Sequence, residues 1–213
     1  MIIKQIHSYL MAKSYDYAMR STEKRCLQKW RKELLAQADG DLLEIGAGTG
    51  VNTPHYPDRV SQIILSEPDA QMRKQLQHKA GQLQSDKVNI TPWGAESIEM
   101  PDDSFDTIVS TLVLCSVPNL ETSLNEIHRL LRPNGVLLFL EHVISKHLPT
   151  RTWQHRIEPL WGLCAGNCHL TRDTATAIHA SGLKIEQLTE APMVGAPAFV
   201  RGTIRGAARK VSS

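Results

Sequence analysis

The chain has few aromatic residues, few cysteines and no long apolar stretch. Phe, Trp and Tyr make up 5% of 213 residues, and four cysteines are too few for a disulfide scaffold, so a reducing, cytoplasmic location is expected. No apolar run approaches the roughly 18 residues needed to span a bilayer. The first ten residues mix apolar and polar side chains, which indicates neither a signal peptide nor an anchor. A net charge of +2 gives no reason to expect a nucleic-acid partner.

The basic residues are unevenly placed. Residues 191–213 contain four and no acid, and a second cluster lies near the N-terminus, formed by Lys24, Arg25, Lys29, Arg31 and Lys32. A solvated helix face and a free tail are the expected explanation, with contact to phosphate or to a membrane surface as the alternative. Length and the 41% hydrophobic content fit one globular domain with a substantial core.

Apolar strands and helical patterns alternate along the chain. Strands are predicted over 42–45, 60–65, 88–91, 105–110, 136–141, 183–188 and 198–204, and helices over 16–37, 69–83, 120–131 and 171–181, the last with Thr171 as its N-cap. Residues 150–169 show no clean periodicity. This rhythm predicts an α/β protein with a doubly wound, mostly parallel sheet. One domain, 1–213, is expected: a helical cap over 1–38, a ligand-binding half over 39–145 and an acceptor-side segment over 146–213.

A glycine-rich stretch, Glu44–Gly50, follows the first predicted strand. Gly46, Gly48 and Gly50 alternate with other residues, and Ala47 lies between the first two. Glycines allow a tight turn and a close approach of a ligand to backbone N–H groups. The spacing differs from the G-x-G-x-x-G of dinucleotide-binding proteins, which disfavours a nicotinamide oxidoreductase. The stretch predicts a nucleoside-type ligand at the carboxyl end of the strand.

Three later positions suit the same ligand. Glu67 follows the second strand, 21 residues after Gly46, where a carboxylate can bind both ribose hydroxyls, and Pro68 fits a first helical turn. Gly94-Ala95-Glu96 follows the third strand, and Thr111-Leu112 the fourth. Asp106 is expected to be a turn acid without a chemical role.

Taken in order, these motifs resemble those of class I S-adenosylmethionine (SAM)-dependent methyltransferases. The resemblance implies a seven-stranded sheet with an antiparallel last strand, and SAM as the cofactor. In that family the residue at Gly94 is usually Asp or Asn. The cofactor residues so implied are Tyr15, Glu44, Gly46, Ala47, Gly48, Gly50, Glu67, Pro68, Gly94, Ala95, Glu96, Thr111 and Leu112.

Over roughly residues 40–190 the chain resembles a narrower group, the thiol S-methyltransferases. The matching stretches outside the cofactor motifs are 153–154, 159–161 and Cys168-His-Leu-Thr-Arg172. The N-terminal anchor of the animal proteins is absent from this sequence, and His169 stands where they have Asn. Phospholipid N-methyltransferases and quinone C-methyltransferases are more distant relatives, with a Tyr-Asp element similar to Tyr15-Asp16.

Several residues are candidates for the acceptor side. His142, just after the fifth strand, and His169 are candidate general bases; a buried core histidine and a capping or surface histidine are the alternatives. Candidate acceptor contacts are Cys115, Trp153, Trp161 and Arg172, for which core packing or an ordinary ion pair would also suffice. The spacing of Cys164, Cys168 and His169 is poor for zinc, and no metal is predicted.

The expected function is therefore methyl transfer from SAM to a small molecule, most simply a lipophilic or metabolite thiol. The alternatives are N-, O- or C-methylation of a phospholipid headgroup, phenol or quinone, and a module that senses SAM without catalysis. The basic termini leave peripheral membrane contact open. Acceptor identity and oligomeric state do not follow from the sequence.

Overall fold

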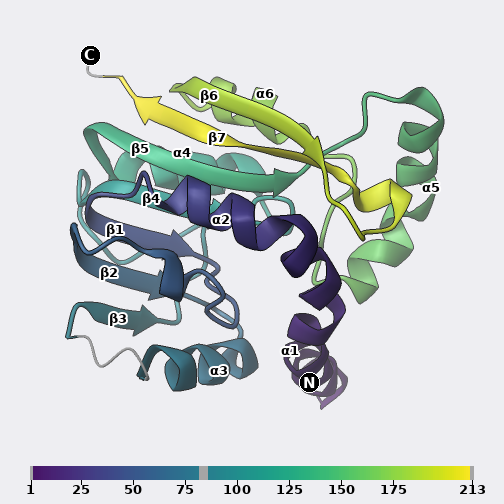
Figure 1. Ribbon diagram of the computed structural model, residues 1–213, viewed down its shortest axis with the longest axis horizontal. Helices are drawn as coiled ribbons and strands as arrows, with labels where there is room; N and C mark the ends of the chain where they lie inside the picture. The colour runs from purple at the N-terminus through teal and green to yellow at the C-terminus, as the bar shows by residue number, and fades with distance from the viewer. Residues whose placement is uncertain (1, 82–85, 212–213) are drawn as a thin grey trace.

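The computed structural model describes residues 2–81 and 86–211, built around a seven-stranded sheet (Figure 1). The strand order is β3-β2-β1-β4-β5-β7-β6. The strands are β1 (Gly40–Ile45), β2 (Val60–Ser66), β3 (Val88–Thr91), β4 (Phe105–Thr111), β5 (Leu131–His142), β6 (Leu183–Pro192) and β7 (Gly202–Lys210). Strands β1 to β5 are parallel, and β7 runs antiparallel to both β5 and β6. The predicted fold class is confirmed.

The helices lie on both faces of the sheet and beyond one edge. They are α1 (Ile2–Thr22), α2 (Gln28–Leu35), α3 (Ala70–Gly81), α4 (Leu120–Leu130), α5 (Leu148–Cys164) and α6 (Thr174–Ala180). A π-helical turn, η1 (Glu23–Leu27), joins α1 to α2, and η2 (Thr53–His55) and η3 (Ala198–Val200) are short 3₁₀ turns. In Figure 1, α2 crosses one face, α4 and α6 lie behind, and α1 and α5 stand where β1 and β5 end.

The sheet separates two apolar cores, as expected for parallel strands buried on both faces. Leu43 packs with α4 and α6, whereas its neighbour Leu42 packs with α2. This follows from the alternation of side chains along a strand. Leu65 and Leu76 form a third, smaller cluster under α3.

Polar contacts at the amino ends of the strands fix their register. Arg132 at the start of β5 forms ion pairs with Asp41 and Asp106, and Asp106 also accepts a hydrogen bond from the Asp41 N–H. Asp106 therefore holds strands together, and it lies within β4 instead of in the turn that the sequence predicts. Asn119 caps α4 by accepting from the Thr122 N–H at 3.0 Å.

The structure corrects the predicted elements outside the central sheet. The N-terminal helix begins well before residue 16, and residues 150–169 are mostly α5, whose exposed leucines and two prolines obscure its periodicity. Asp173, rather than Thr171, is the N-cap of α6, and the last strand covers 202–210 instead of 198–204. Within the two described ranges no helix has the length and apolarity to cross a membrane.

Candidate active site

The glycine-rich turn after β1 leaves an open cradle. Gly46, Gly48 and Gly50 have φ values of +57°, +58° and +82°, which L-residues rarely adopt. A Cβ on Gly46 would lie 2.7 Å from the Val113 side chain, so the chain passes close there. A Cβ on Gly48 would find no atom nearer than 3.9 Å. The turn therefore faces open space at Gly48, where a ligand can approach the backbone; Ala47 is buried beneath it.

Glu67 lies beside this cradle. Its carboxylate accepts hydrogen bonds of 2.8 Å from the N–H groups of Gly48 and Asp69. Burial raises the pKa of Glu67, and the two backbone donors oppose that shift. A carboxylate has about four acceptor positions, so two remain for the ribose hydroxyls that the sequence analysis assigned to it.

Asp69 also corrects the expectation for Pro68. The Asp69 side chain accepts from the N–H groups of Gln71 and Met72, so it caps α3. Pro68 precedes the helix instead of occupying its first turn.

Glu44 is held by a buried hydrogen-bond network behind the turn. It accepts from Asn52 at 2.8 Å and from the Tyr56 hydroxyl at 2.6 Å. Burial raises the pKa of Glu44 to about 7, against the effect of the two hydrogen bonds and of Arg31. Both carboxylate oxygens of this motif residue are thus engaged by the protein.

The position of Arg31 differs most from the one expected from the sequence. It belongs to the N-terminal basic cluster, yet only 2% of it is exposed. Its guanidinium donates to Asn52 at 2.9 Å and Thr111 at 2.7 Å and pairs with Glu23. Arg31 lies four residues after Leu27 and four before Leu35, both fully buried. That spacing places it on the apolar face of the helix and was the available signal.

The N-terminal helix is bonded to the glycine-rich turn. Thr49 Oγ1 donates to Asp16 at 2.6 Å, and Lys79 of α3 pairs with Asp16 at 2.8 Å. Burial raises the pKa of Tyr15 to about 12, with Arg31 opposing and Cys115 adding to the shift.

The loops after β3 and β4 are bonded to each other, and the loop after β4 also approaches the glycine-rich turn at Val113. Gly94 pairs with Ser97 in an isolated bridge, Ala95 is buried, and Glu96 accepts from the Asn119 N–H at 2.9 Å. Leu112 has φ +60° and donates its N–H to Leu140 O at 2.7 Å. The chain thus leaves β4 abruptly after Thr111, whose hydroxyl is bound by Arg31.

Glu141 shapes the next loop, a role the sequence analysis did not assign. Its buried carboxylate accepts from Ser110 Oγ at 2.6 Å, Val113 N at 3.2 Å and Cys115 N at 3.3 Å. Burial raises its pKa despite these donors. The carboxylate holds residues 113–115 against the end of β5.

Cys115, His142, Trp161 and Cys168 meet at the carboxyl ends of β4 and β5; we call these four residues the thiol cluster. Neither ring nitrogen of His142 nor the indole nitrogen of Trp161 has a well-formed hydrogen-bond partner. Cys115 lowers the pKa of Cys168, burial opposes this, and His142 and Trp161 lower it further. The predicted candidates Cys115, His142 and Trp161 are therefore brought together, with Cys168 in addition.

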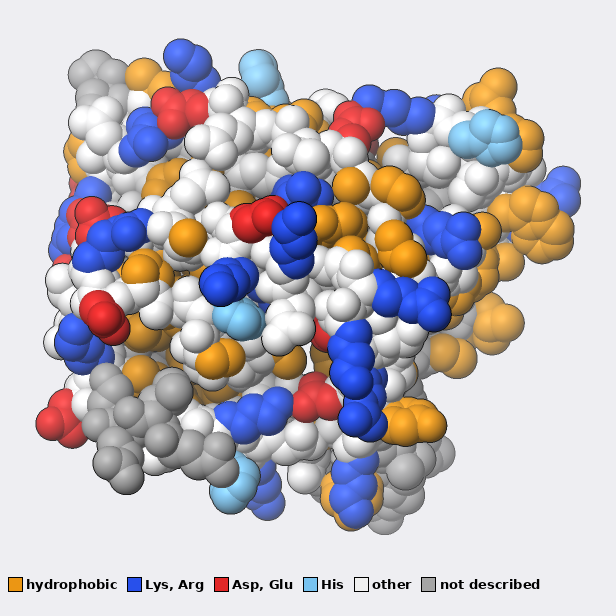
Figure 2. All heavy atoms as spheres, in the orientation of Figure 1, with side chains coloured by type: hydrophobic (Ala, Val, Ile, Leu, Met, Phe, Trp, Pro, Cys, Tyr) orange, Lys and Arg blue, Asp and Glu red, His pale blue; other side chains and the backbone are white. Residues whose placement is uncertain are grey.

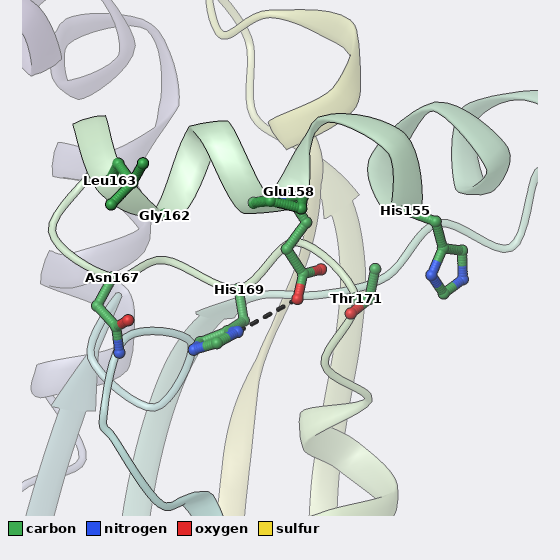
Figure 3. Close-up of a pocket in the computed structure, with 8 residues that line it drawn as sticks. His155, Glu158, Gly162, Leu163, Asn167, His169 and Thr171 are labelled. Carbon is green, nitrogen blue, oxygen red and sulfur yellow. Dashed lines mark hydrogen bonds and ion pairs between the residues drawn. The ribbon is translucent and has the colours of Figure 1, made fainter.

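His169 faces a separate cavity of about 350 Å³ between α5 and the following loop (Figure 3). Its Nδ1 lies 3.2 Å from Glu158 Oε1, and its backbone N–H donates to Cys115 O at 2.8 Å. The structure thus separates the two candidate bases: His142 belongs to the thiol cluster, and His169 pairs with an acid on α5.

Arg172 and Trp153 lie outside the thiol cluster. Arg172 donates to the carbonyls of Leu114 and Val117, each at 2.6 Å, and it precedes α6 instead of lying in its first turn. Trp153 is 60% exposed and lines a groove with Phe199, whereas Trp161 packs edge-on against Phe199 at 5.1 Å. Only one of the two tryptophans, Trp161, lies in the thiol cluster.

The sheet order, the glycine-rich turn and the acid after β2 define a class I SAM-dependent methyltransferase. Residues 43–139 match the methyltransferase domain model. The fold is similar to the YcgJ protein of Bacillus subtilis (TM-score 0.70, 17% identity, 88% of this chain and 98% of that one). It is also similar to a geranyl diphosphate methyltransferase in complex with SAM (TM-score 0.67, 14% identity, 86% of this chain and 84% of that one).

A closer relationship is seen in sequence. The chain is 33% identical to thiol S-methyltransferase TMT1B of Rattus norvegicus over 198 residues, which are 90% of this chain and 80% of the rat protein. The chain belongs to this family of SAM-dependent methyltransferases. The open cradle at Gly48 and the remaining acceptor positions of Glu67 fit SAM as its cofactor.

Proposed function

We propose that this enzyme methylates the sulfur atom of a small lipophilic thiol. The observation that carries the proposal is His142, which is 2% exposed at the carboxyl end of β5, has no well-formed hydrogen bond at either ring nitrogen, and lies beside the Cys168 thiol. A buried imidazole without a well-formed hydrogen bond requires an explanation. Binding an acceptor S–H group is one, and the relationship to thiol S-methyltransferases favours it.

Methyl transfer to a thiol requires two things of the protein: alignment of the acceptor sulfur with the methyl group, and removal of one proton. When bound, SAM supplies a methyl group activated by a positively charged sulfur. A free thiol with a pKa of about 8.5 is only a few per cent ionised at neutral pH. His142 would take the thiol proton at an unprotonated ring nitrogen, so that the acceptor sulfur becomes a thiolate. The Gly48 turn and Glu67 would hold the nucleoside, and the loop braced by Glu141 would bound the space between.

The thiol cluster supports an apolar acceptor. Cys115 is buried, and Trp161, which packs edge-on against Phe199, forms an aromatic wall beside Cys168. Such a wall excludes water and stabilises an aliphatic or aromatic acceptor body by burial of apolar area.

The test is S-adenosylhomocysteine formation by the purified protein with alkyl thiols, aryl thiols, phenols, amines and phospholipid vesicles. Product mass would locate the methyl group. We expect turnover of thiols. Turnover of phenols, amines or vesicles without thiols would overturn the proposal and leave the methyltransferase assignment intact.

The role of His142 is tested by a comparison of thiols that differ in acidity. His142→Ala should lower kcat/KM for alkyl thiols by about 10²-fold or more and for the more acidic aryl thiols by much less. His147→Ala, an exposed histidine near Thr150, is the matched control and should change neither. An equal loss for both classes of thiol would show that His142 is not the base.

A second candidate, methylation of a lipid headgroup or quinone, is favoured by the outer face of α5. Leu148, Leu160 and Leu163 are each about 70% exposed there, and orange side chains gather at this edge of the molecule in Figure 2. Exposed apolar groups of this size suit contact with a membrane surface. Turnover that requires vesicles would support this candidate.

A further inference from the structure

The loop that carries Cys168 is bound closely to the loop that carries Cys115. His169 donates its N–H to Cys115 O at 2.8 Å, and Asn167 Nδ2 donates to Ser116 O at 2.8 Å. Arg172 adds hydrogen bonds of 2.6 Å to Leu114 O and Val117 O. Four hydrogen bonds from residues 167–172 thus hold the two cysteines side by side.

The two thiols also interact with one another. Their side-chain contact raises the pKa of Cys115 and lowers that of Cys168. Cys168 is partly exposed and Cys115 is buried. A partly exposed cysteine thus lies against a second, buried one. Among residues 2–81 and 86–211, no group of three or more His, Cys, Asp or Glu side chains is arranged to hold a metal ion.

We propose that Cys115 and Cys168 form a reversible disulfide that switches off methyl transfer when the protein meets a peroxide. A partly exposed thiol held beside a second thiol by the bonds between their loops is the arrangement that oxidation converts into a disulfide. The bond would tie residues 167–172 to the loop after β4 and remove the Cys168 thiol from contact with His142 and Trp161.

The chemistry balances with hydrogen peroxide as the oxidant. The Cys168 thiolate attacks one peroxide oxygen, the O–O bond breaks, and Cys168 becomes a sulfenic acid as hydroxide leaves and takes up a proton. The Cys115 sulfur then attacks the Cys168 sulfur, the S–O bond breaks, and the Cys115 proton leaves with the hydroxide as water. Two thiols lose two electrons, and one peroxide gives two waters.

The first test is chemical and does not depend on the acceptor. The whole protein is treated with hydrogen peroxide, remaining thiols are alkylated, and peptides are mapped by mass spectrometry without reduction. We expect one linked peptide pair containing Cys115 and Cys168, removed by dithiothreitol, with Cys26 and Cys164 alkylated. A Cys164–Cys168 link, a link between two chains, or oxidation of Cys168 to sulfinic acid without a link would overturn the proposal.

The second test concerns function. Oxidised wild-type protein should still bind S-adenosylhomocysteine, since Gly48 and Glu67 belong to the loops after β1 and β2, and should lose turnover that dithiothreitol restores. Cys164→Ser, at an exposed cysteine four residues away, should keep basal activity and the same sensitivity to peroxide. Cys168→Ser should lose the sensitivity whatever its basal rate. Full turnover by the linked protein would overturn the switch, and failure of every thiol acceptor would overturn only the proposed function.

Discussion

Arg31 of α2 donates a hydrogen bond of 2.7 Å to the hydroxyl of Thr111, the last residue of β4. This bond joins the N-terminal helix to the strand end that borders the cofactor cradle. Asn52 connects both residues to Glu44, so one network includes the helix, the turn after β1 and the end of β4.

Replacing Arg31 by Met should destabilise the protein strongly. The change leaves Asn52 Oδ1 without its donor, removes one of the two donors to Thr111 Oγ1, and breaks the ion pair to Glu23. Loss of one partner from a buried pair costs about 3–5 kcal/mol. Urea unfolding measures the effect. Lys29→Met, which removes an exposed pair with Glu33 on the same helix, should change the free energy of unfolding by less than about 0.5 kcal/mol. Equal changes in the free energy of unfolding for the two variants would show that the network does not stabilise the fold.

Glu44 should make stability depend on pH. Its pKa is about 7 in the folded protein, against 4.5 for an unperturbed glutamate, the value that applies to the unfolded chain. Between these values the unfolded chain has already lost the proton that the folded chain keeps. The unfolded state therefore binds fewer protons, and stability falls as pH rises, by at most about 1.4 kcal/mol per pH unit. The raised pKa values of Glu67 and Glu141 act in the same direction.

The measurement is urea unfolding at several pH values between 4.5 and 7 for the wild type and Glu44→Gln. The free energy of unfolding of the variant should fall less steeply with rising pH, so that the variant gains stability relative to the wild type. Two parallel curves would contradict the assignment of this titration to Glu44.

Glu67→Ala should weaken cofactor binding without preventing folding. Hydrogen bonds to a charged group contribute about 1.5–3 kcal/mol, so the Kd for S-adenosylhomocysteine should rise roughly 10- to 100-fold. Isothermal titration calorimetry measures it. Glu99→Ala, at an exposed carboxylate beyond the β3 loop, serves as control and should leave the Kd unchanged. An unchanged Kd in Glu67→Ala would remove this residue from the cofactor site.

Gly46→Ala should be destabilising for two separable reasons. The new methyl group would meet Val113 at 2.7 Å, and φ would still be +57°. Val113→Ala in the same chain should relieve the first effect and leave the second, a strain of about 1–2 kcal/mol. Thermal unfolding of the single and double variants tests this. Gly81→Ala is the control and should be neutral or slightly stabilising: its φ is not positive, and an added Cβ would meet none of the described residues within 4 Å beyond its own helix and chain neighbours. Additive losses in the double variant would contradict the contact.

The sheet and the cofactor side were predictable because their signals are local. Buried parallel strands are short apolar runs, and the turn after β1 requires glycines at positive φ, so Gly46, Gly48 and Glu67 could be placed by order and spacing. Arg31 could not, because a charged residue in a basic cluster is usually solvated, and its burial depends on partners 21 and 80 residues away.

The acceptor side was harder for a related reason. The contact between Cys115 and Cys168 joins two loops whose distance depends on how α5 is placed, and α5 carries its apolar residues partly on the outside. Glu141 was visible in the sequence as the end of an apolar strand. Its three hydrogen bonds to the end of β4 and the loop that follows could not be predicted, because they depend on the pairing of β4 with β5.

The hydrogen bond between Asp16 and Thr49 also couples cofactor binding to the stability of the first helix. If the ordered helix tightens the grip of the glycine-rich turn on its ligand, the ligand must protect the helix by the same factor. Amide hydrogens of α1 should then exchange more slowly once S-adenosylhomocysteine is bound, although the helix need not touch it.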